Sequence, residues 1–419
     1  MRDNFFSSPT VEARHRKGTF GVHLVFFISW MQEHGYAHRT ILSNIECVSK
    51  FGKYLEQRNF SSIKQLEGEE GQRILGTYRQ YCKANQHWDT NSGIRLFIRA
   101  LEDSGVLRNL PSRSSSLSYH TEQYADFLLS QRGLSESTIY RHTYWTEKFL
   151  CFLGYRKGTP SLPTFDIADV DKFIEQEGSR LQRSTQYSLA GVLKSFLRFL
   201  YQSGKLNTDL SCLITSPRLY KLASLPSVLN QDEVQKIIDS VDRSTRVGLQ
   251  HYGILVLLTT YGLRAGEVAN LKLEDIDWRK ETILIAQGKT GQDLWLPLTP
   301  KVGKAIIQYL KQARPSSKYP ELFLLTKAPW TPLTRQNIGY VVNRHIQLAG
   351  LSPSQRGPHL LRHSFATNLI RRGVCLKEIG DMLGHRDPNS TYLYTKTAVE
   401  NLREVALEVP KEVKTWEKN

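Results

Sequence analysis

Two tyrosines in the stretch LGHRDPNSTYLYTK, Tyr392 and Tyr394, are separated by a single leucine near the end of the sequence. A phenol can act as a nucleophile, although a weak one at neutral pH because its pKa lies near 10. If the stretch is helical, each residue advances about 100° around the axis, so residues two apart point in nearly opposite directions. The two side chains therefore cannot serve the same function.

Cationic side chains accompany these tyrosines in the last part of the sequence. Arg264 follows a long apolar stretch at a glycine turn, where a guanidinium is costly unless an anion binds there. His359 and Arg362 are three residues apart in HLLRHSF and share one face if that stretch is helical. Lys289 lies between two glycines, and His385 follows a Leu-Gly pair. Any one of these residues alone is typical of a surface or of a helix cap.

Together, these residues supply two guanidinium groups, an ammonium, two imidazoles and a phenol. Guanidinium groups bind phosphate oxygens through paired hydrogen bonds and stabilise the charge that develops on phosphorus in a transition state. The set therefore favours phosphodiester chemistry, in which a tyrosine attacks phosphorus and forms a covalent link. No cluster of carboxylates with metal-binding spacing accompanies the set, so we expect neither a metal nor a cofactor.

The elements that must position these groups are mostly helices. Asn230 and Glu233 have the spacing of a capping box at the start of a helix, and a long buried helix is predicted to end in TTYGLRAGEVANL. Two short strands are expected at 282–286 and 293–298, joined by QGKTGQ, and ELFLL (321–325) is a further strand candidate. The pattern predicts an α+β domain with a small antiparallel sheet.

The first half of the sequence contains an internal repeat. Residues 34–55 resemble residues 132–153, with a glycine five residues before a Thr-Ile pair in each copy. Further on, FIRALEDSGVL (97–107) parallels FLRFLYQSGKL (196–206). Each copy has the apolar spacing of several amphipathic helices. Matching glycines, Thr-Ile pairs and Ser-Gly turns in one order favour duplication over two unrelated helical bundles.

Two linkers divide the chain into three predicted domains. The segments 110–118 and 216–227 replace periodic patterning with Pro, Ser and basic residues. The predicted domains are 1–112 and 113–222, one copy of the repeat each, and 223–419, which holds the candidate chemistry. The expected fold class is mainly α with a small antiparallel sheet.

The charge of the chain is strongly positive, with a formal net charge of +16 over 419 residues. Each of the three predicted domains has more Lys and Arg than Asp and Glu, so the excess is distributed along the chain. A distributed positive field suits a protein that wraps a polyanion, with nucleic acid as the leading candidate. On charge alone, a basic protein without such a partner is an equally good interpretation.

The cysteines and the apolar runs indicate the compartment. Five scattered cysteines without a C-x-x-C pair argue against a disulfide framework or a zinc site and fit a reducing cytoplasm. The runs FGVHLVFFISWM and YGILVLLTTYGL are too short to span a bilayer, and we interpret the first as a core helix and not a signal peptide. We expect no membrane association and a cytoplasmic, nucleoid-associated location.

Four motifs occur in one order along the chain: GLRAGEV, HLLRH, LGHRD and TYLY. On these motifs, residues 229–409 resemble the catalytic domain of the tyrosine recombinases, the phage-integrase-like or λ-integrase-type family. Residues 118–210, with RGLSESTIY, are similar to the helical core-DNA-binding domain of that family, and residues 20–110 match it less well, through the repeat. The resemblance implies two tandem helical DNA-binding bundles followed by an α+β tyrosine-recombinase catalytic domain.

The resemblance also implies a role for each candidate side chain. Arg264 and Arg362 match the two arginines that grip the scissile phosphate. Lys289 matches the general acid that protonates the leaving 5′-oxygen. His359 matches the partner in proton transfer, and His385 occupies the place of a His or Trp that contacts the phosphate.

The nucleophile of this family lies nine residues after the histidine of the L-G-H motif, which selects Tyr394. Tyr392 is then expected to be packed or at the surface. Glu267, within the first arginine motif, is expected to support that motif structurally. One departure from the family pattern is Lys396, which stands two residues after the nucleophile where many relatives have histidine; we interpret it as subfamily variation.

The implied function is site-specific DNA recombination, with integration or transposition as outcomes and some similarity to transposon-borne members. The implied reaction cleaves and rejoins strands of double-stranded DNA through a 3′-phosphotyrosyl link, without metal or ATP. The implied assembly is a homo-tetramer, or a hetero-assembly with related recombinases, on paired sites. Two alternatives stay open: a type IB topoisomerase-like nicking-closing enzyme, and a catalytically silent DNA-binding relative.

Two further segments have more than one interpretation. The first copy of the repeat is expected to be an arm-like domain or an extra surface for DNA or a partner. Residues 399–409 have an amphipathic stripe, expected to dock on a neighbouring subunit or, alternatively, on their own domain.

Overall fold

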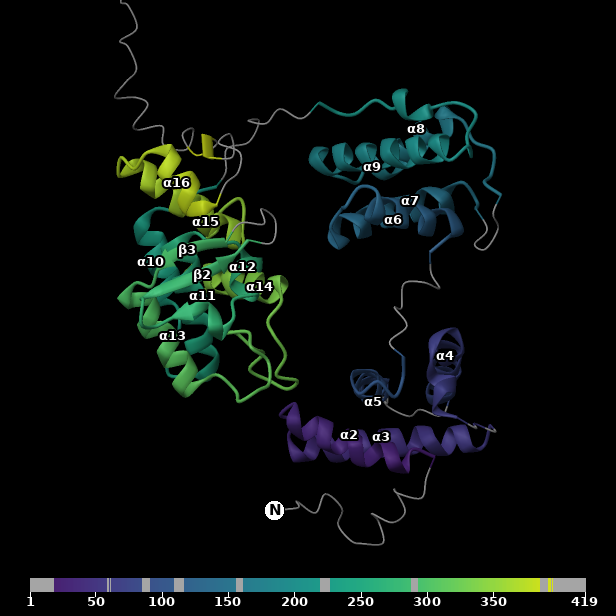
Figure 1. Ribbon diagram of the computed structural model, residues 1–419, viewed down its shortest axis with the longest axis horizontal. Coiled ribbons are helices and arrows are strands. Elements are labelled where there is room, and N and C mark those ends of the chain that lie inside the picture. Colours follow the sequence, from purple (N-terminus) through teal and green to yellow (C-terminus); the bar gives the residue numbers. More distant parts are fainter. Residues whose placement is uncertain are drawn as a thin grey trace, which may run out of the picture. The chain divides into compact units, whose positions relative to one another are not determined.

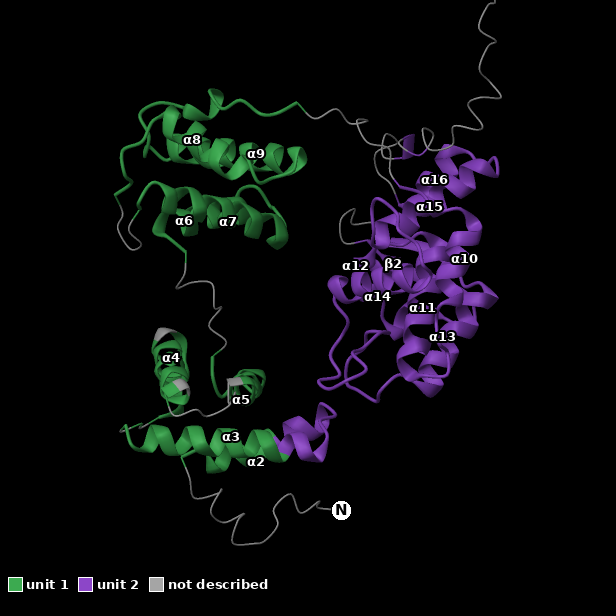
Figure 2. Ribbon diagram, turned by 180° about the vertical axis from the view of Figure 1, so that it is seen from behind, with its two compact units in different colours: residues 1–27, 42–223 green, residues 28–41, 224–419 purple. Residues whose placement is uncertain are grey.

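The computed structural model (Figure 1) divides the chain into two compact units (Figure 2). The first unit contains residues 1–27 and 42–223, and the second contains residues 28–41 and 224–419. The structure describes residues 19–58, 60, 62–84, 91–108, 117–155, 161–218, 227–287, 293–384, 391–392 and 394.

The regular elements in the described part of the first unit are helices. Those of the first copy of the repeat are α2 (Gly21–Glu33), α3 (His38–Glu56), η1 (Ile63–Leu66), α4 (Gly68–Ala84) and α5 (Asn91–Asp103), with the end of α2 and the start of α3 grouped in the second unit. Those of the second copy are α6 (Tyr119–Ser130), α7 (Glu136–Phe152), α8 (Ile167–Gly178), α9 (Arg183–Gln202) and η2 (Leu210–Cys212).

Positions that correspond in the two copies have the same structural role. Phe51 in α3 and Phe149 in α7 are both fully buried. The Ser-Gly turns that follow α5 and α9 both contain a glycine with positive φ, 75° at Gly105 and 70° at Gly204, a conformation that L side chains rarely adopt. Each copy therefore closes its last helix with the same turn.

The second unit is built around one buried helix, α11 (Arg246–Tyr261). Helices α13 (Pro300–Gln312) and α15 (Pro358–Arg371) pack against it. Its remaining helices are α10 (Gln231–Asp239), α12 (Ala265–Ala269), η3 (Leu273–Asp275), α14 (Arg335–Leu348) and α16 (Leu376–Leu383). The apolar stretch YGILVLLTTYGL thus forms the centre of a core and not a surface stripe.

A three-stranded antiparallel sheet, β1 (Ile276–Asp277), β2 (Thr282–Ala286) and β3 (Asp293–Pro297), lies in this unit in the order β1-β2-β3. In the β2–β3 register, Ile283 faces Leu296 and both side chains are buried. Tyr261, the last residue of α11, donates a hydrogen bond from its hydroxyl to the carbonyl of Pro297 at 2.6 Å. The sheet is therefore fixed to the end of the central helix.

The predicted elements are found with two differences. The mainly α class, the two strands and the capping box are confirmed, since Asn230 and Glu233 exchange hydrogen bonds of 2.8 Å. The short strand β1 was not predicted. The strand prediction for ELFLL (321–325) is wrong, because this segment forms only isolated bridges, from Glu321 to Lys272 and from Leu324 to Pro332. Its run of apolar residues reflects the burial of Leu322, Phe323 and Leu324 and not a ladder. None of the described helices is long and apolar enough to cross a membrane.

Candidate active site

A glycine turn places Arg264 at the start of a new helix. Gly262 ends α11 with φ +62°, and a Cβ at this position would lie 2.5 Å from the Phe365 ring. Two residues later, the backbone N–H of Arg264 donates to Glu267 Oε2 at 2.7 Å, and its guanidinium donates to Glu267 Oε1 at 2.6 Å. Glu267 is buried, so it holds both the backbone and the side chain of Arg264, in the supporting role expected of it.

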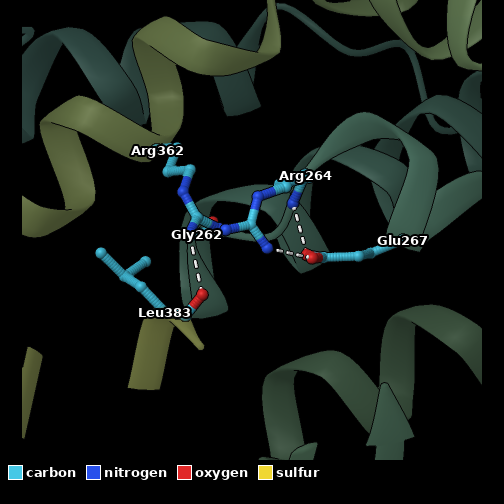
Figure 3. Close-up of polar contacts among 5 residues, drawn as sticks. All are labelled: Gly262, Arg264, Glu267, Arg362 and Leu383. Atoms are coloured by element: carbon cyan, nitrogen blue, oxygen red, sulfur yellow. Dashed lines mark hydrogen bonds and ion pairs between the residues drawn. The ribbon is translucent and has the colours of Figure 1, made fainter. Parts of the chain in front are cut away.

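Arg362, on α15, lies in the interior with 4% of its surface exposed. Its guanidinium donates to the carbonyl of Gly262 at 2.8 Å and to that of Leu383, at the end of α16, also at 2.8 Å. Figure 3 shows that this group and the guanidinium of Arg264 point toward one another. Burial lowers the pKa of Arg362, and the nearby charge of Arg264 lowers it further. Two converging cations of this kind form a site that favours a bound anion.

Tyr394 lies beside the arginines and is 3% exposed. It packs in a small apolar cluster with Ala366, Ile379 and Leu383. A side-chain hydrogen bond joins it to Arg362. Burial raises the pKa of the Tyr394 phenol, while the charges of Arg362 and Arg264 oppose that rise. The buried phenol is therefore protonated in this state and lies next to a group that favours its anion.

Tyr392 differs from Tyr394 in its surroundings, because it is 56% exposed. Both residues are helical, and the opposite exposures agree with two positions on nearly opposite faces of a helix. The structure thus joins Tyr394 to the two arginines.

His359 and His363 lie one turn apart on α15. His359 is exposed in the first turn of the helix. The His363 ring is 6.2 Å from that of His359 and 5.4 Å from that of Tyr394, measured between ring centroids. Burial, then the charges of His359 and Arg362, lower the pKa of His363 to about 4. Sequence reasoning assigned no role to His363, although its spacing four residues after His359 indicates a shared helix face.

Lys289 and His385 lie outside the described residues. The last described residues before them, Gln287 and Gly384, are close together. A Cβ added at Gly384 would overlap the Gln287 side chain, whose amide oxygen would lie 2.3 Å away. Gly384 has φ +61° and ends α16, and Gln287 follows β2. The ends of α16 and β2 are therefore adjacent.

Of the six predicted site residues, the structure brings together Arg264, Arg362 and Tyr394, and places His359 at the start of the helix that carries Arg362. Among the described residues, no group of three or more His, Cys, Asp or Glu side chains could hold a metal ion. The arrangement can bind an anion at two guanidinium groups and present a phenol to it.

The family model of the phage integrase family matches residues 227–401. A putative integrase/recombinase of Sinorhizobium fredii is 29% identical over 412 residues, which is 97% of this chain and 99% of that protein. The tyrosine recombinase XerD of Listeria monocytogenes is 30% identical over 68% of this chain and 96% of its own length. The full-length match includes the first copy of the repeat, and the XerD match covers 290 residues.

Solved structures share the fold. A XerH site-specific recombinase bound to a palindromic difH substrate, a post-cleavage complex, matches with a TM-score of 0.55 and 22% identity over 79% of this chain and 93% of that one. A λ integrase tetramer bound to a Holliday junction matches with a TM-score of 0.51 and 18% identity over 73% of this chain and 87% of that one.

Proposed function

This chain belongs to the tyrosine recombinase family, and from that premise we propose that its second unit cleaves and rejoins DNA with Tyr394 as the nucleophile. The chain is a site-specific DNA recombinase, and relatives such as XerD and XerA are named tyrosine recombinases. The observation that carries the residue assignment is the convergence of the Arg264 and Arg362 guanidinium groups beside the buried Tyr394 phenol.

Cleavage begins when the scissile phosphate binds Arg264 and Arg362. The phosphate competes with the Tyr394 hydroxyl for the Arg362 guanidinium, so binding releases that hydroxyl for attack. A bond forms between the phenol oxygen and phosphorus, and the bond from phosphorus to the 5′-oxygen breaks. The arginines stabilise the added charge on the phosphate oxygens in the transition state.

The remaining roles complete the proton balance. Lys289 gives a proton to the leaving 5′-oxygen, His359 takes part in proton transfer, and His385 contacts the phosphate. The 3′-phosphotyrosyl link conserves the energy of the broken bond, so religation by a 5′-hydroxyl needs no ATP. We propose that the positive charge of these groups also makes a metal ion unnecessary.

We propose that the chain has three domains, residues 1–112, 113–222 and 223–419. Residues 113–222 form the core-DNA-binding domain. Its helices α7 and α9, which pack against each other, both carry exposed aromatic and cationic side chains. Such side chains suit a polyanion with stacked bases. These exposed residues are Tyr140, Arg141, Tyr144, Tyr187 and Arg198. Residues 1–112 supply an arm-like domain or an extra surface for DNA or a partner.

The partner is double-stranded DNA, and the assembly is a homo-tetramer, or a hetero-assembly with related recombinases, on paired sites. The tetrameric λ integrase complex with a Holliday junction supports this proposal by its shared fold. Action on DNA places the protein with the chromosome in the cytoplasm.

The test needs no known target site. Wild type, Tyr394→Phe and Tyr392→Phe are expressed in cells, isolated under denaturing conditions in EDTA, and any attached DNA is sequenced. Attached DNA is expected in wild type and Tyr392→Phe and not in Tyr394→Phe, while DNA binding stays intact because one hydroxyl adds little to a phosphate-dominated interface.

A plasmid with two copies of the recovered sequence then distinguishes the functions. Exchanged product is the expected result. Covalent attachment with relaxation alone would identify a topoisomerase-like enzyme, and DNA binding without attachment would identify a catalytically silent relative.

A further inference from the structure

Helix α2, in the first copy of the repeat, carries apolar side chains on both of its sides. On the inner side, Phe27 is fully buried and packs against Phe97 of α5, with ring centroids 5.2 Å apart. On the other side, Val22 is 83% exposed, Val25 is 43% exposed and Phe26 is half-buried. Residues at i, i+3 and i+4 share one face of a helix, and we call these three the outer face of α2. A helix that is apolar all round is normally covered on every side.

The outer face of α2 is uncharged, although the chain has a formal net charge of +16. Glu33, at the end of α2, is the single Asp, Glu, Lys or Arg in the sequence of this helix. His23 lies next to the outer face, and burial lowers its pKa, so it is neutral near pH 7. DNA is bound through Lys and Arg, and a helix that lies on a membrane carries Lys or Arg beside its apolar face. The outer face therefore suits neither a polyanion nor a bilayer.

The matching helix of the second copy, α6, has a different outer side. It carries Glu122 and Asp126 away from its core, beside the exposed Tyr119 and Leu129. The same bundle therefore forms with carboxylates on this helix. An uncharged apolar face on α2 is not a requirement of the bundle, so it needs a reason of its own.

The next helix of the first copy, α3, differs from its counterpart α7 as well. Where α7 exposes Arg141 and Tyr144, the matching positions of α3 expose Ser43 and Glu46. Glu46 forms an ion pair with Lys50 at 2.8 Å, which offsets the charge of that lysine. Helix α3 therefore does not repeat the side chains through which α7 is proposed to bind DNA. The surfaces of α2 and α3 fit a different kind of partner.

We propose that the outer face of α2 binds the same face of a second copy of this chain, a contact that rests on the proposed function because it forms on DNA. Two chains of the same positive charge repel each other where their cations meet, so an uncharged face is the surface on which they can approach. In an antiparallel pair with two-fold symmetry, Val25 of each protomer lies near the axis and meets its counterpart.

The size of α2 determines how strong this contact can be. The helix has 13 residues and is therefore about 20 Å long. With a helix diameter of about 10 Å, the pair covers roughly 200 Å² on each protomer, well below the roughly 800 Å² per partner of a stable interface. The pair therefore does not persist in dilute solution. Two protomers bound side by side on one DNA reach effective concentrations in the millimolar range, where a weak contact forms and makes DNA binding cooperative.

The experiment measures the binding of the full-length protein to DNA with the sequence recovered by covalent attachment. One DNA fragment holds the site of a single protomer, and a second fragment holds two adjacent sites. The affinity per site on the second fragment, divided by that on the first, gives the cooperativity. Wild type, Val25→Glu, Val25→Lys and an equal mixture of the two variants are compared. Thermal unfolding checks that each variant folds, and Val22→Glu tests the same face at a second position.

Each Val25 variant is expected to bind the single site nearly as wild type does. On two sites, each is expected to lose about tenfold or more in cooperativity, because two like charges meet at the axis. The mixture is expected to recover much of the cooperativity, because a glutamate then meets a lysine. The matched control is Ser43→Glu, which adds the same charge at an exposed position of α3 and is expected to keep the cooperativity of wild type.

Wild-type protein that binds two sites without cooperativity, or Val25 variants as cooperative as wild type, would overturn the proposal. Cooperativity that is lost in both variants and not recovered in the mixture would assign the outer face to another surface, such as residues 1–18 of the same chain, and would also overturn it. Weaker single-site binding by Val25→Glu with stronger binding by Val25→Lys would show that the face lies on DNA. Each of these results leaves covalent attachment through Tyr394 intact, whereas a wild type that never attaches to DNA would overturn the proposed function itself.

Discussion

At the scale of single residues, Arg264 and Arg362 are held in different ways. Arg362 binds the carbonyls of Gly262 and Leu383, so its removal would leave two carbonyls without their donor and damage the fold as well as the chemistry. Arg264 donates to Glu267 and its side chain is 23% exposed, so its chemical role can be tested more cleanly.

Arg264→Ala is expected to lower single-turnover cleavage by about 10²–10³-fold, because a preorganised charge on the transition state is lost. It is also expected to lower stability by about 1–3 kcal/mol, since buried Glu267 loses its partner. The matched double variant Arg264→Ala/Glu267→Gln should recover most of the stability and none of the cleavage. Recovery of cleavage in the double variant would mean that Arg264 acts through Glu267 and not on the phosphate.

The family resemblance implied that the arginines and Tyr394 share a site, but not how they are held. The hydrogen bonds of Arg362 reach residues 100 and 21 positions away along the chain, and no local pattern reports such contacts. For the same reason, the motif HLLRH did not reveal that the ring beside Tyr394 belongs to His363. Which of two nearby histidines meets the nucleophile depends on how α15 packs.

At the scale of elements, the turn between α11 and α12 fixes the direction of Arg264. Gly262 has a left-handed conformation, φ +62°, and leaves no space for a Cβ beside Phe365. Four residues later, Gly266 lies within α12, where an added Cβ would meet nothing within 4 Å. The backbone conformation and the packing therefore require glycine at position 262, whereas neither requires it at position 266.

Gly262→Ala is expected to lower the free energy of unfolding by more than 2 kcal/mol, because a strained φ of about 1–2 kcal/mol adds to the overlap with Phe365. Gly266→Ala, its matched control, is expected to be neutral or to stabilise α12, since alanine is the better helix former by about 1 kcal/mol. Chemical denaturation in the absence of DNA measures both. Equal stabilities of the two variants would contradict this account of the turn.

The elements themselves were largely predictable, because alternation, capping and apolar periodicity are local signals. The hairpin strands and the capping box of α10 follow from such signals. The segment 321–325 shows the limit of that approach. Its backbone makes one hydrogen bond to Leu271 on one side and one to Leu333 on the other. The buried apolar run therefore links two neighbouring segments and does not form a strand in a sheet. Burial from the rest of the unit cannot be distinguished from strand pairing by pattern alone.

At the scale of the whole molecule, a buried polar network joins three helices of the second unit. His251 on α11 contacts His345 on α14 through ring nitrogens 2.9 Å apart, and the other ring nitrogen of His345 lies 2.9 Å from the hydroxyl of Ser240 after α10. Burial lowers the pKa of His345 and lowers that of His251 to about 4. Both imidazoles are therefore neutral in the folded protein at neutral pH.

The stability of the second unit is expected to fall as the pH drops below about 6.5. In the unfolded chain His251 takes up a proton near its ordinary pKa, whereas in the folded unit it stays neutral down to about pH 4. The unfolded state then binds more protons, so stability decreases across this window, by about 3 kcal/mol for one such group. Melting temperatures of wild type and His345→Gln across pH 4–8 test this. A wild-type melting temperature independent of pH would contradict it.

The division into repeated helical bundles was visible in sequence because turn glycines and buried aromatics recur in the same order in both copies. Gly35 and Gly133, which match across the copies, both have positive φ, of 78° and 57°. The boundary between the two compact units was not predictable in this way. Residues 28–41 belong to the second unit, and no local sequence signal separates them from the rest of α2 and α3.

The most direct test of the central claim is to identify the amino acid that carries DNA. Covalent complexes from wild-type protein are digested with nuclease and trypsin, and the peptide 387–396, which contains both Tyr392 and Tyr394, is sequenced by tandem mass spectrometry. The account predicts a nucleotide on Tyr394 and none on Tyr392. A nucleotide on Tyr392, or on a residue outside this peptide, would contradict it.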